Sequence, residues 1–257
     1  MKEITSVHNA AVQLLRELQK PRARRENGLF VCESAKLVGE AVALRLAQAL
    51  FIEKGREAEY APMIGQAESA GCELYVVSMA VMQAVSTAKT PQGVVCTARI
   101  PQPPKALAGR RLVALDGVQD PGNVGTVIRT ANALGMDAVV LTGACADLYS
   151  PKTVRAAMGA LFRQPVLTCS MDELMQLLHA HGLKLYGAAL TDAAQDLRRA
   201  PLSPAAVAIG SEGRGLSAQL LAQCDGQIII PMQPGAESLN AAVAAAVVMW
   251  EIARAGM

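Results

Sequence analysis

The amino-acid sequence predicts an α/β protein with a small N-terminal α/β domain and a larger α/β domain built on a parallel sheet. Short apolar runs alternate with longer amphipathic segments along the 257 residues, as in proteins whose helices cover both faces of a sheet. Apolar residues make up 52% of the chain and aromatic residues only 3%, so Ala, Val, Leu and Ile must build the cores. A proline-rich break, PQPPKALAGRR at residues 101–111, divides the alternation into two parts.

This break predicts a domain boundary near residue 106. Its first four residues are Pro-Gln-Pro-Pro, which excludes a helix or a central strand, and the glycine and basic pair that follow continue the linker. We therefore expect one domain at residues 1–105 and another at residues 106–257, each long enough to fold around a core of its own.

The N-terminal domain is expected to begin with a helix that Ser6 caps and whose apolar face runs from Val7 to Leu18. After it, KPRARR at residues 20–25 indicates either a solvated basic loop or a contact for nucleic acid. The expected strands lie at residues 28–34, 49–54, 72–78 and 93–100. The expected helices lie at residues 33–45, 61–71 and 79–85.

The larger domain alternates more regularly between strand and helix patterns. Its expected strands lie at residues 111–117, 137–143, 183–190, 205–213 and 227–232. Its expected helices lie at residues 123–135, 150–162, 171–182 and 238–256. The strands are continuous apolar runs, which are typical of a parallel sheet that is buried on both faces.

The composition argues against secretion, a membrane span and a metal centre. The chain shows no basic start followed by an apolar run and a cleavage site, and its most apolar stretch, residues 241–255, is too short to span a bilayer. The six cysteines form no CxxC pair and do not cluster with the three histidines. We therefore expect a soluble cytoplasmic protein with reduced thiols, no membrane contact and no metal.

The first of three candidate motifs is DPGNVGTVIRTA, residues 120–131, which follows an expected strand. It lacks the glycine spacing of a dinucleotide-binding loop and the GK[ST] of a P-loop, so it weakens a proposal of NAD or nucleotide binding. Gly125 and Arg129 are i, i+4 neighbours and are expected to face one cavity. Arg129 is then either a buried structural arginine or a group aimed at a phosphate or a reacting atom.

The second and third motifs also follow expected strands. AIGSEGRGLS, residues 208–217, predicts a ligand-facing loop, because ligands of open α/β sheets bind beyond the carboxyl ends of the strands. IIIPMQPGAESLNAAVAAA, residues 228–246, runs from a strand through a Pro-Gly loop into a helix of small residues. Here the alternative to a functional role is that Ser238 caps the helix and Asn240 satisfies nearby backbone groups.

Taken together, these motifs resemble those of the SpoU/TrmH family of RNA 2′-O-ribose methyltransferases, which belong to the SPOUT class. The resemblance covers essentially all of residues 111–256, in order and in spacing. The residues that carry it are Asn123, Gly125 and Arg129 in the first motif, Gly210, Glu212, Gly213 and Gly215 in the second, and Pro231, Ser238, Leu239 and Asn240 in the third. More loosely, the first 100 residues resemble the substrate-binding domain often fused in front, which is similar to ribosomal RNA-binding proteins.

The resemblance implies a C-terminal domain with a deep trefoil knot that holds S-adenosylmethionine, mostly through backbone groups. By position it assigns Gly210, Ile230, Leu239 and Ala189 to the cofactor. It implies methyl transfer to a ribose 2′-hydroxyl, with Arg129 as the central catalytic residue. Because arginine stays charged in proteins, we expect Arg129 to bind a phosphate and stabilise a developing alkoxide rather than to remove a proton. The remaining expected catalytic residues are Asn123, Glu212, Ser238 and Asn240.

The resemblance also implies an RNA partner, with ribosomal RNA favoured over tRNA, and a homodimer formed through the C-terminal domain. The expected RNA-binding residues are Arg22, Arg24, Arg25, Arg129 and Arg155. Two other interpretations remain open. The chain could be a catalytically silent RNA-binding or ribosome-assembly module, which the intact polar residues of the motifs argue against. It could also be an ordinary nucleotide-dependent α/β enzyme, which the absent nucleotide motifs argue against.

Overall fold

The computed structural model describes residues 1–102, 109–202, 204–233, 235 and 238–255, and it divides them into two units. The first unit is Met1–Gln102 together with Tyr149–Arg155, and the second is the remainder of the chain. The predicted boundary between residues 105 and 106 lies outside the described residues. Among the described helices, none has the length and apolar character needed to cross a membrane.

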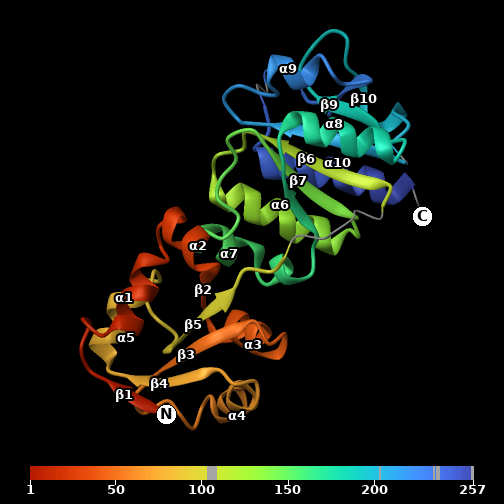
Figure 1. Cartoon of the computed structure of the whole chain (residues 1–257). Helices are drawn as coiled ribbons and strands as arrows, with labels where there is room; N and C mark the ends of the chain where they lie inside the picture. Colours follow the sequence, from red (N-terminus) through yellow and green to blue (C-terminus); the bar gives the residue numbers. More distant parts are fainter. Residues whose placement is uncertain (103–108, 203, 234, 236–237, 256–257) are drawn as a thin grey trace. The chain divides into compact units, whose positions relative to one another are not determined.

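The first unit is built on a mixed five-stranded sheet with the order β1-β4-β3-β5-β2 (Figure 1). Its strands are β1 (Lys2–Ile4), β2 (Leu29–Glu33), β3 (Ala47–Glu53), β4 (Glu73–Val77) and β5 (Val94–Arg99). Its helices are α1 (Ala10–Glu17), α2 (Pro21–Asn27), α3 (Ala35–Ala43), α4 (Ala61–Ser69) and α5 (Met79–Val85). β5 runs antiparallel to both β2 and β3, whereas β1, β4 and β3 are parallel.

Amphipathic helices close the core of this unit as the apolar spacing predicts. Val12 and Leu15 of α1 and Val81 of α5 belong to one buried cluster that includes Phe51 and Tyr75 from the sheet. The cap of α1 differs from the prediction, because Asn9 and not Ser6 accepts a hydrogen bond from the backbone N–H of Ala11. Helix α1 therefore starts at Ala10.

The basic stretch at residues 20–25 is the main departure from the sequence prediction in this unit, because it forms helix α2 and not a loop. Pro21 occupies the first turn, where it costs no hydrogen bond, and Gly28 ends the helix at a φ of 64°. Arg24 is only 2% exposed, and its Nη1 donates to the carbonyl of Leu18, the C-cap of α1, at 2.7 Å. The prediction that Arg24 contacts RNA is therefore wrong for the folded unit, since its guanidinium is turned inward onto the end of α1.

We expect Arg24→Ala to lower the free energy of unfolding by about 1.5–3 kcal/mol, the usual contribution of a hydrogen bond that involves a charged group. Urea unfolding followed by circular dichroism would measure this change. Arg25→Ala is the matched control, because Arg25 is exposed on the next position of the same helix. Equal stabilities of the two variants would contradict a structural role for Arg24.

The second unit is built on a seven-stranded sheet with the order β10-β12-β9-β11-β6-β7-β8, in which every neighbouring pair is parallel. Its strands are β6 (Arg111–Asp116), β7 (Ala138–Thr142), β8 (Val166–Thr168), β9 (Lys184–Ala188), β10 (Gln195–Asp196), β11 (Ala205–Gly210) and β12 (Gly226–Ile229). The α-helices after residue 110 are α6 (Pro121–Ala133), α7 (Pro151–Ala157), α8 (Met171–Ala180), α9 (Ala218–Leu221) and α10 (Ala241–Ala255). Short 3₁₀ helices are η1 (Ala160–Phe162) and η2 (Leu197–Arg199).

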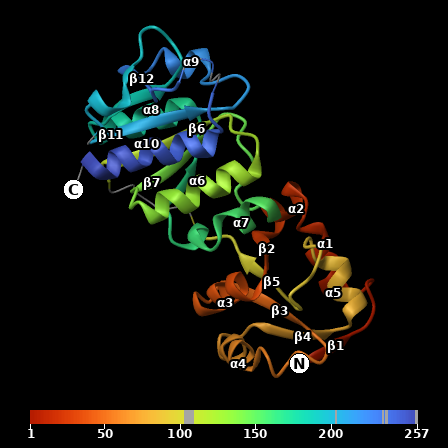
Figure 2. The same cartoon turned by 180° about the vertical axis from the view of Figure 1, so that it is seen from behind.

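Helices cover both faces of this sheet, which is why its strands β6, β7 and β11 are buried along almost their whole length. Figures 1 and 2 show α8 on one face, and α6 and α10 side by side on the other. Leu174 and Leu178 of α8 join a buried cluster with Leu112 and Ala114 of β6. Because successive strand residues point to opposite faces, the buried Val113 lies on the side of α6 and α10. The predicted α/β class and parallel sheet are confirmed, and the trefoil knot stays a prediction.

Candidate functional site

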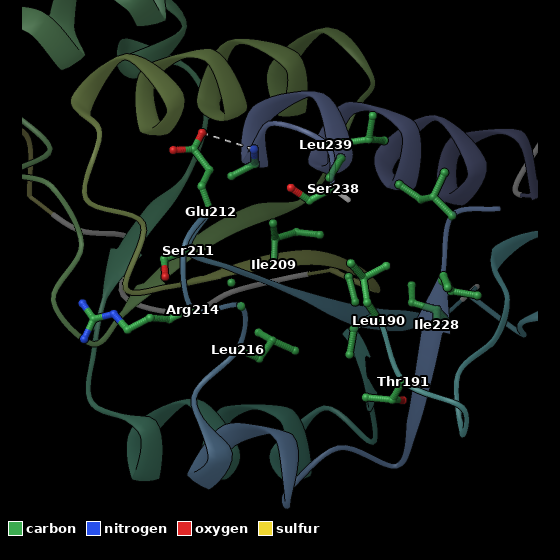
Figure 3. Close-up of a pocket in the computed structure, with 18 of the residues that line it drawn as sticks. Leu190, Thr191, Ile209, Ser211, Glu212, Arg214, Leu216, Ile228, Ser238 and Leu239 are labelled. Carbon is green, nitrogen blue, oxygen red and sulfur yellow. Dashed lines mark hydrogen bonds between the residues drawn. The ribbon is translucent and has the colours of Figure 1, made fainter. Parts of the chain in front are cut away.

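A cavity of about 370 Å³ lies at the carboxyl ends of β9, β11 and β12 (Figure 3). β11, β9 and β12 are successive neighbours in the sheet, so the segments that follow them meet at one edge. The lining residues are Ala188–Thr191, Ile209–Glu212, Arg214–Leu216, Leu221, Ile228–Ile230, Met232, Ser238, Leu239, Ala241 and Ala244. Most of this wall is apolar, and Glu212 and Arg214 are its charged members.

The loop that follows β11 folds back tightly over Gly210. A Cβ on Gly210 would lie 2.0 Å from the carbonyl carbon of Gly215, so only glycine fits there. Ser211 and Gly215 close the loop through two backbone hydrogen bonds of 3.0 and 2.8 Å. Gly215 has a φ of 67°, which glycine adopts without strain. The glycines of the second motif therefore give one side of the cavity a fixed backbone wall.

Glu212 joins the three motifs at the rim of the cavity. Its Oε1 accepts hydrogen bonds from Nδ2 of Asn123 at 2.5 Å, from Nδ2 of Asn240 at 2.6 Å and from the backbone N–H of Ala241 at 3.4 Å. Among the residues that the structure describes, no donor contacts the other carboxylate oxygen, Oε2. The network thus holds the carboxylate in one orientation and leaves one oxygen open to a ligand.

Asn240 caps α10 and belongs to this network at the same time. Its Oδ1 accepts from the backbone N–H groups of Ala242 and Val243 at 3.0 and 3.2 Å. Because the oxygen faces the helix, Nδ2 must face Glu212 and Asn123, whose Oδ1 it also contacts at 3.1 Å. The alternative that Asn240 only satisfies nearby backbone groups therefore accounts for the contacts of Oδ1 but not for those of Nδ2.

The structure brings most of the predicted site residues together. The cavity is lined by all four residues assigned to the cofactor and by two assigned to catalysis: Gly210, Ile230, Leu239, Ala189, Glu212 and Ser238. Asn123 and Asn240 do not line it but reach its rim through Glu212. Asn123 lies in the first turn of α6, and its backbone N–H donates to Oδ1 of the N-cap residue Asp120 at 3.0 Å.

Arg129 lies outside the cavity. It is exposed on α6, two turns beyond the rim, while its neighbour Gly125 is buried. Among the described residues it has no ion-pair partner, so the alternative of a buried structural arginine is excluded. The expectation that Gly125 and Arg129 face one cavity within a single copy of the chain is not met, since neither residue lines it.

The other predicted RNA-binding residues belong to the first unit. Arg22 and Arg25 are exposed on α2, where Arg22 forms an i, i+4 ion pair with Glu26. Nη1 of Arg155 donates to Oγ1 of Thr87 at 2.8 Å. Thr87 in turn donates to the buried carboxylate of Glu33. Arg155 thus has a structural partner while its side chain stays exposed.

Sequence reasoning missed several residues of the cavity, among them Leu190, Ser211, Arg214 and Leu216. Ser211, Arg214 and Leu216 lie inside the second motif, so its prediction as a ligand-facing loop could have included them. Leu190 lies two residues beyond β9, next to Ala189, which the family resemblance and not the apolar run of the strand assigned to the cofactor.

Two thiols of the second unit are poor nucleophiles. Burial raises the pKa of the Cys224 thiol to about 11, so the sulfur stays protonated and a poor nucleophile near neutral pH. Burial also raises the pKa of Cys145, whose Sγ donates to backbone carbonyls. Across the described part of the chain, no group of three or more His, Cys, Asp or Glu residues could hold a metal ion.

Sequence comparisons identify both parts of the chain. Residues 110–250 match the SpoU rRNA Methylase family, and residues 9–96 match the MRM3-like substrate binding domain. The chain is 35% identical to a Bacillus subtilis protein named 23S rRNA (guanosine(2553)-2′-O)-methyltransferase RlmP, over 98% of this chain and 99% of that protein. It is also 35% identical to an uncharacterized tRNA/rRNA methyltransferase of Synechocystis, over 98% and 93% of the two chains.

Solved structures with the same architecture include two with S-adenosylmethionine bound. The AdoMet-bound rRNA methyltransferase of Sinorhizobium meliloti has a TM-score of 0.90 and 29% identity, over 100% of this chain and 98% of that one. The SpoU methyltransferase AviRb of Streptomyces viridochromogenes, in complex with AdoMet, has a TM-score of 0.85 and 26% identity. That match covers 96% of this chain and 99% of AviRb.

Proposed function

The chain belongs to the SpoU rRNA methylase family, and from this premise we propose that it moves a methyl group from S-adenosylmethionine to a ribose 2′-hydroxyl of 23S ribosomal RNA. It is a methyltransferase by family. The observation that carries the finer proposal is the rim of the cavity, where Asn123, Glu212 and Asn240 form one hydrogen-bonded group beside an apolar, glycine-walled pocket. The intact carboxylate and its two amide partners argue against a silent binding module.

The residues that line the cavity support S-adenosylmethionine as its ligand. Ile230 and Leu239 line it and could contact both faces of an adenine ring, and Gly210 lets the backbone approach a ligand closely. Once bound there, S-adenosylmethionine would supply an electrophilic methyl group. The residues of the chain then have to hold and activate the ribose hydroxyl.

A ribose hydroxyl becomes a good nucleophile when its proton is removed or its developing charge is stabilised. We assign the open Oε2 of Glu212 to accept the hydrogen bond of the 2′-hydroxyl and to take its proton toward solvent as the new O–CH₃ bond forms. Asn123 and Asn240 keep that carboxylate in place. Ser238, which is exposed on the cavity wall, would orient the ribose.

Arg129 has its role at the junction of two copies of the chain. Its guanidinium is exposed and does not reach the cavity of its own copy, and α6 packs beside α10. An exposed apolar stripe on α10, formed by Val243, Val247 and Trp250, offers the contact for a second copy. We propose that Arg129 binds an RNA phosphate and stabilises the developing alkoxide in a site that two copies share.

The main support for the substrate is the similarity to RlmP over the full length of both proteins, which favours a guanosine of 23S rRNA over tRNA. The test is in vitro methylation with tritium-labelled S-adenosylmethionine on unmodified 23S rRNA and on tRNA, followed by mapping of the 2′-O-methylated nucleotide. Label on 23S rRNA at a ribose is the expected result. Label on tRNA alone would refute the substrate. RNA and cofactor binding without methylation would support the silent module.

We expect α2 to help the first unit bind RNA through its exposed arginines. Removal of one cation that binds a phosphate should reduce the log–log salt slope of RNA binding by about one unit, so Arg22→Gln with Arg25→Gln should reduce it by about two. Fluorescence anisotropy at several salt concentrations measures this slope. Lys54→Gln is the control, because Lys54 is an exposed cation of the same unit that follows β3 and does not belong to α2. An unchanged slope in the double variant would identify α2 as a solvated helix.

A further inference from the structure

Asp116, the last residue of β6, is a buried carboxylate that the proposed chemistry does not use. It is 6% exposed and does not line the cavity. Taking a carboxylate out of water is costly unless hydrogen bonds or charges compensate it. Its Oδ2 accepts the backbone N–H of Ser217 at 2.7 Å. This hydrogen bond therefore compensates part of the cost of burying the Asp116 carboxylate at the end of a central strand.

Ser217 is where the cavity loop ends. The loop leaves β11 at Gly210, closes on itself through Ser211 and Gly215, and reaches Ser217, which caps α9. Within the sheet, Gly210 is the register partner of Asp116. The backbone of Asp116 thus pairs with the start of the loop, and its side chain binds the end.

The segment between these two points forms a large part of the cavity wall. Its lining members are Gly210, Ser211, Glu212, Arg214, Gly215 and Leu216. Gly143 leaves room for the other carboxylate oxygen, because a Cβ at that position would lie 3.0 Å from Oδ1 of Asp116. The hydrogen bond to Ser217 is therefore what ties this carboxylate to the loop.

We propose that Asp116 is a positioning residue for cofactor binding: its carboxylate fixes the far end of the loop Gly210–Ser217 and so holds the backbone wall in its binding shape. The inference rests on the proposed function, since it takes S-adenosylmethionine to be the ligand of the cavity. A charged acceptor suits this task because it makes a stronger hydrogen bond to an N–H than a neutral one.

The experiment is calorimetric titration of S-adenosylmethionine into the full-length chain and its variants. Asp116→Ala should weaken binding about tenfold, the effect of losing one charge-assisted hydrogen bond. Asp116→Asn keeps an acceptor oxygen and should stay within a few-fold of the wild type. The apparent KM for RNA should change little in either variant, because Asp116 and Ser217 are not among the residues assigned to RNA.

Asp137→Ala is the matched control for a general loss of stability. Asp137 also accepts backbone N–H groups of β6 and its lead-in, those of Arg110 and Arg111 at 2.8 and 2.9 Å, but at the opposite end of the strand. It should lower the melting temperature without weakening cofactor binding. If Asp137→Ala loses as much affinity as Asp116→Ala at equal stability, the inference is overturned.

If Asp116→Ala does not fold, a second pair of variants tests whether the hydrogen bond between Asp116 and Ser217 supports cofactor binding. Ser217 has a φ of −61°, which proline adopts, and Ser217→Pro removes the N–H that Asp116 binds. Ser217→Ala removes only the capping hydroxyl and keeps the N–H. Weaker cofactor binding in Ser217→Pro than in Ser217→Ala supports the inference, and equal binding overturns it. A wild-type chain that binds no S-adenosylmethionine overturns the proposed function together with this inference.

Discussion

Arg129→Ala should reduce the rate of RNA methylation about 100-fold or more while the affinity for S-adenosylmethionine changes only a few-fold. Removal of one preorganised group that stabilises developing charge has an effect of this size in other enzymes. The cofactor should bind normally because Arg129 lies outside the cavity. Single-turnover methylation measures the rate, and calorimetric titration measures the affinity.

Two further variants test the reason for this effect. Arg129→Lys keeps the charge but loses the planar fork that binds a phosphate through two bonds, so it should recover only part of the rate. Arg198→Ala is the control, because Arg198 is an exposed arginine of the same unit whose charge is ion-paired with Asp196. A wild-type rate in Arg129→Ala would remove this residue from the mechanism.

Val247→Glu together with Trp250→Glu should convert a dimer into a monomer and abolish methylation. The two side chains are 38% and 53% exposed on one face of α10, whereas Val248, Met249 and Ile252 of the same helix are fully buried against its own unit. Exposed apolar side chains at helical spacing mark a contact surface, and a buried charge there would prevent association. Sedimentation equilibrium of the full-length chain measures the oligomeric state.

The control places the same charge on an unrelated exposed leucine. Leu44 of the first unit is 48% exposed, and Leu44→Glu should leave both the dimer and the activity intact. The double variant should still bind S-adenosylmethionine, because none of the changed residues lines the cavity. A wild-type chain that sediments as a monomer at micromolar concentration, or a fully active monomeric variant, would refute the shared site.

The sequence predicts the parallel sheet and the members of the site better than it predicts where exposed and buried charges lie. Helices with strong apolar periodicity, such as α8, follow from burial of one face, and continuous apolar strands, such as β6, follow from burial of both faces. The resemblance to the SpoU/TrmH motifs assigned Glu212, Asn123 and Asn240 to one site, and the position of each motif after a strand agreed with it. Their hydrogen bonds to one another could not be assigned, since they depend on side-chain geometry.

Arg24 and α2 show where local pattern fails. A run of four cationic residues in six indicates solvent exposure, yet the end of α1 offers the Leu18 carbonyl, and this tertiary contact buries one of the four. The two-residue strand β10 could not be predicted from the sequence for a different reason. It carries no apolar pattern and is defined only by its pairing with β12. The sequence singles out Arg129, but in the dimer that we propose, the cavity that this residue serves depends on the second copy of the chain.

The Glu212 network has a consequence for how the protein is made. Its hydrogen bonds join Asn123 to Glu212 across 89 positions and Asn240 to Asn123 across 117. Contacts of such long range form late in folding, because the loop-closure entropy must be overcome first. During translation the nascent chain therefore has no organised rim until Asn240 has left the ribosomal exit tunnel. A nascent chain in which Asn240 is still inside the tunnel should therefore show no methylation activity.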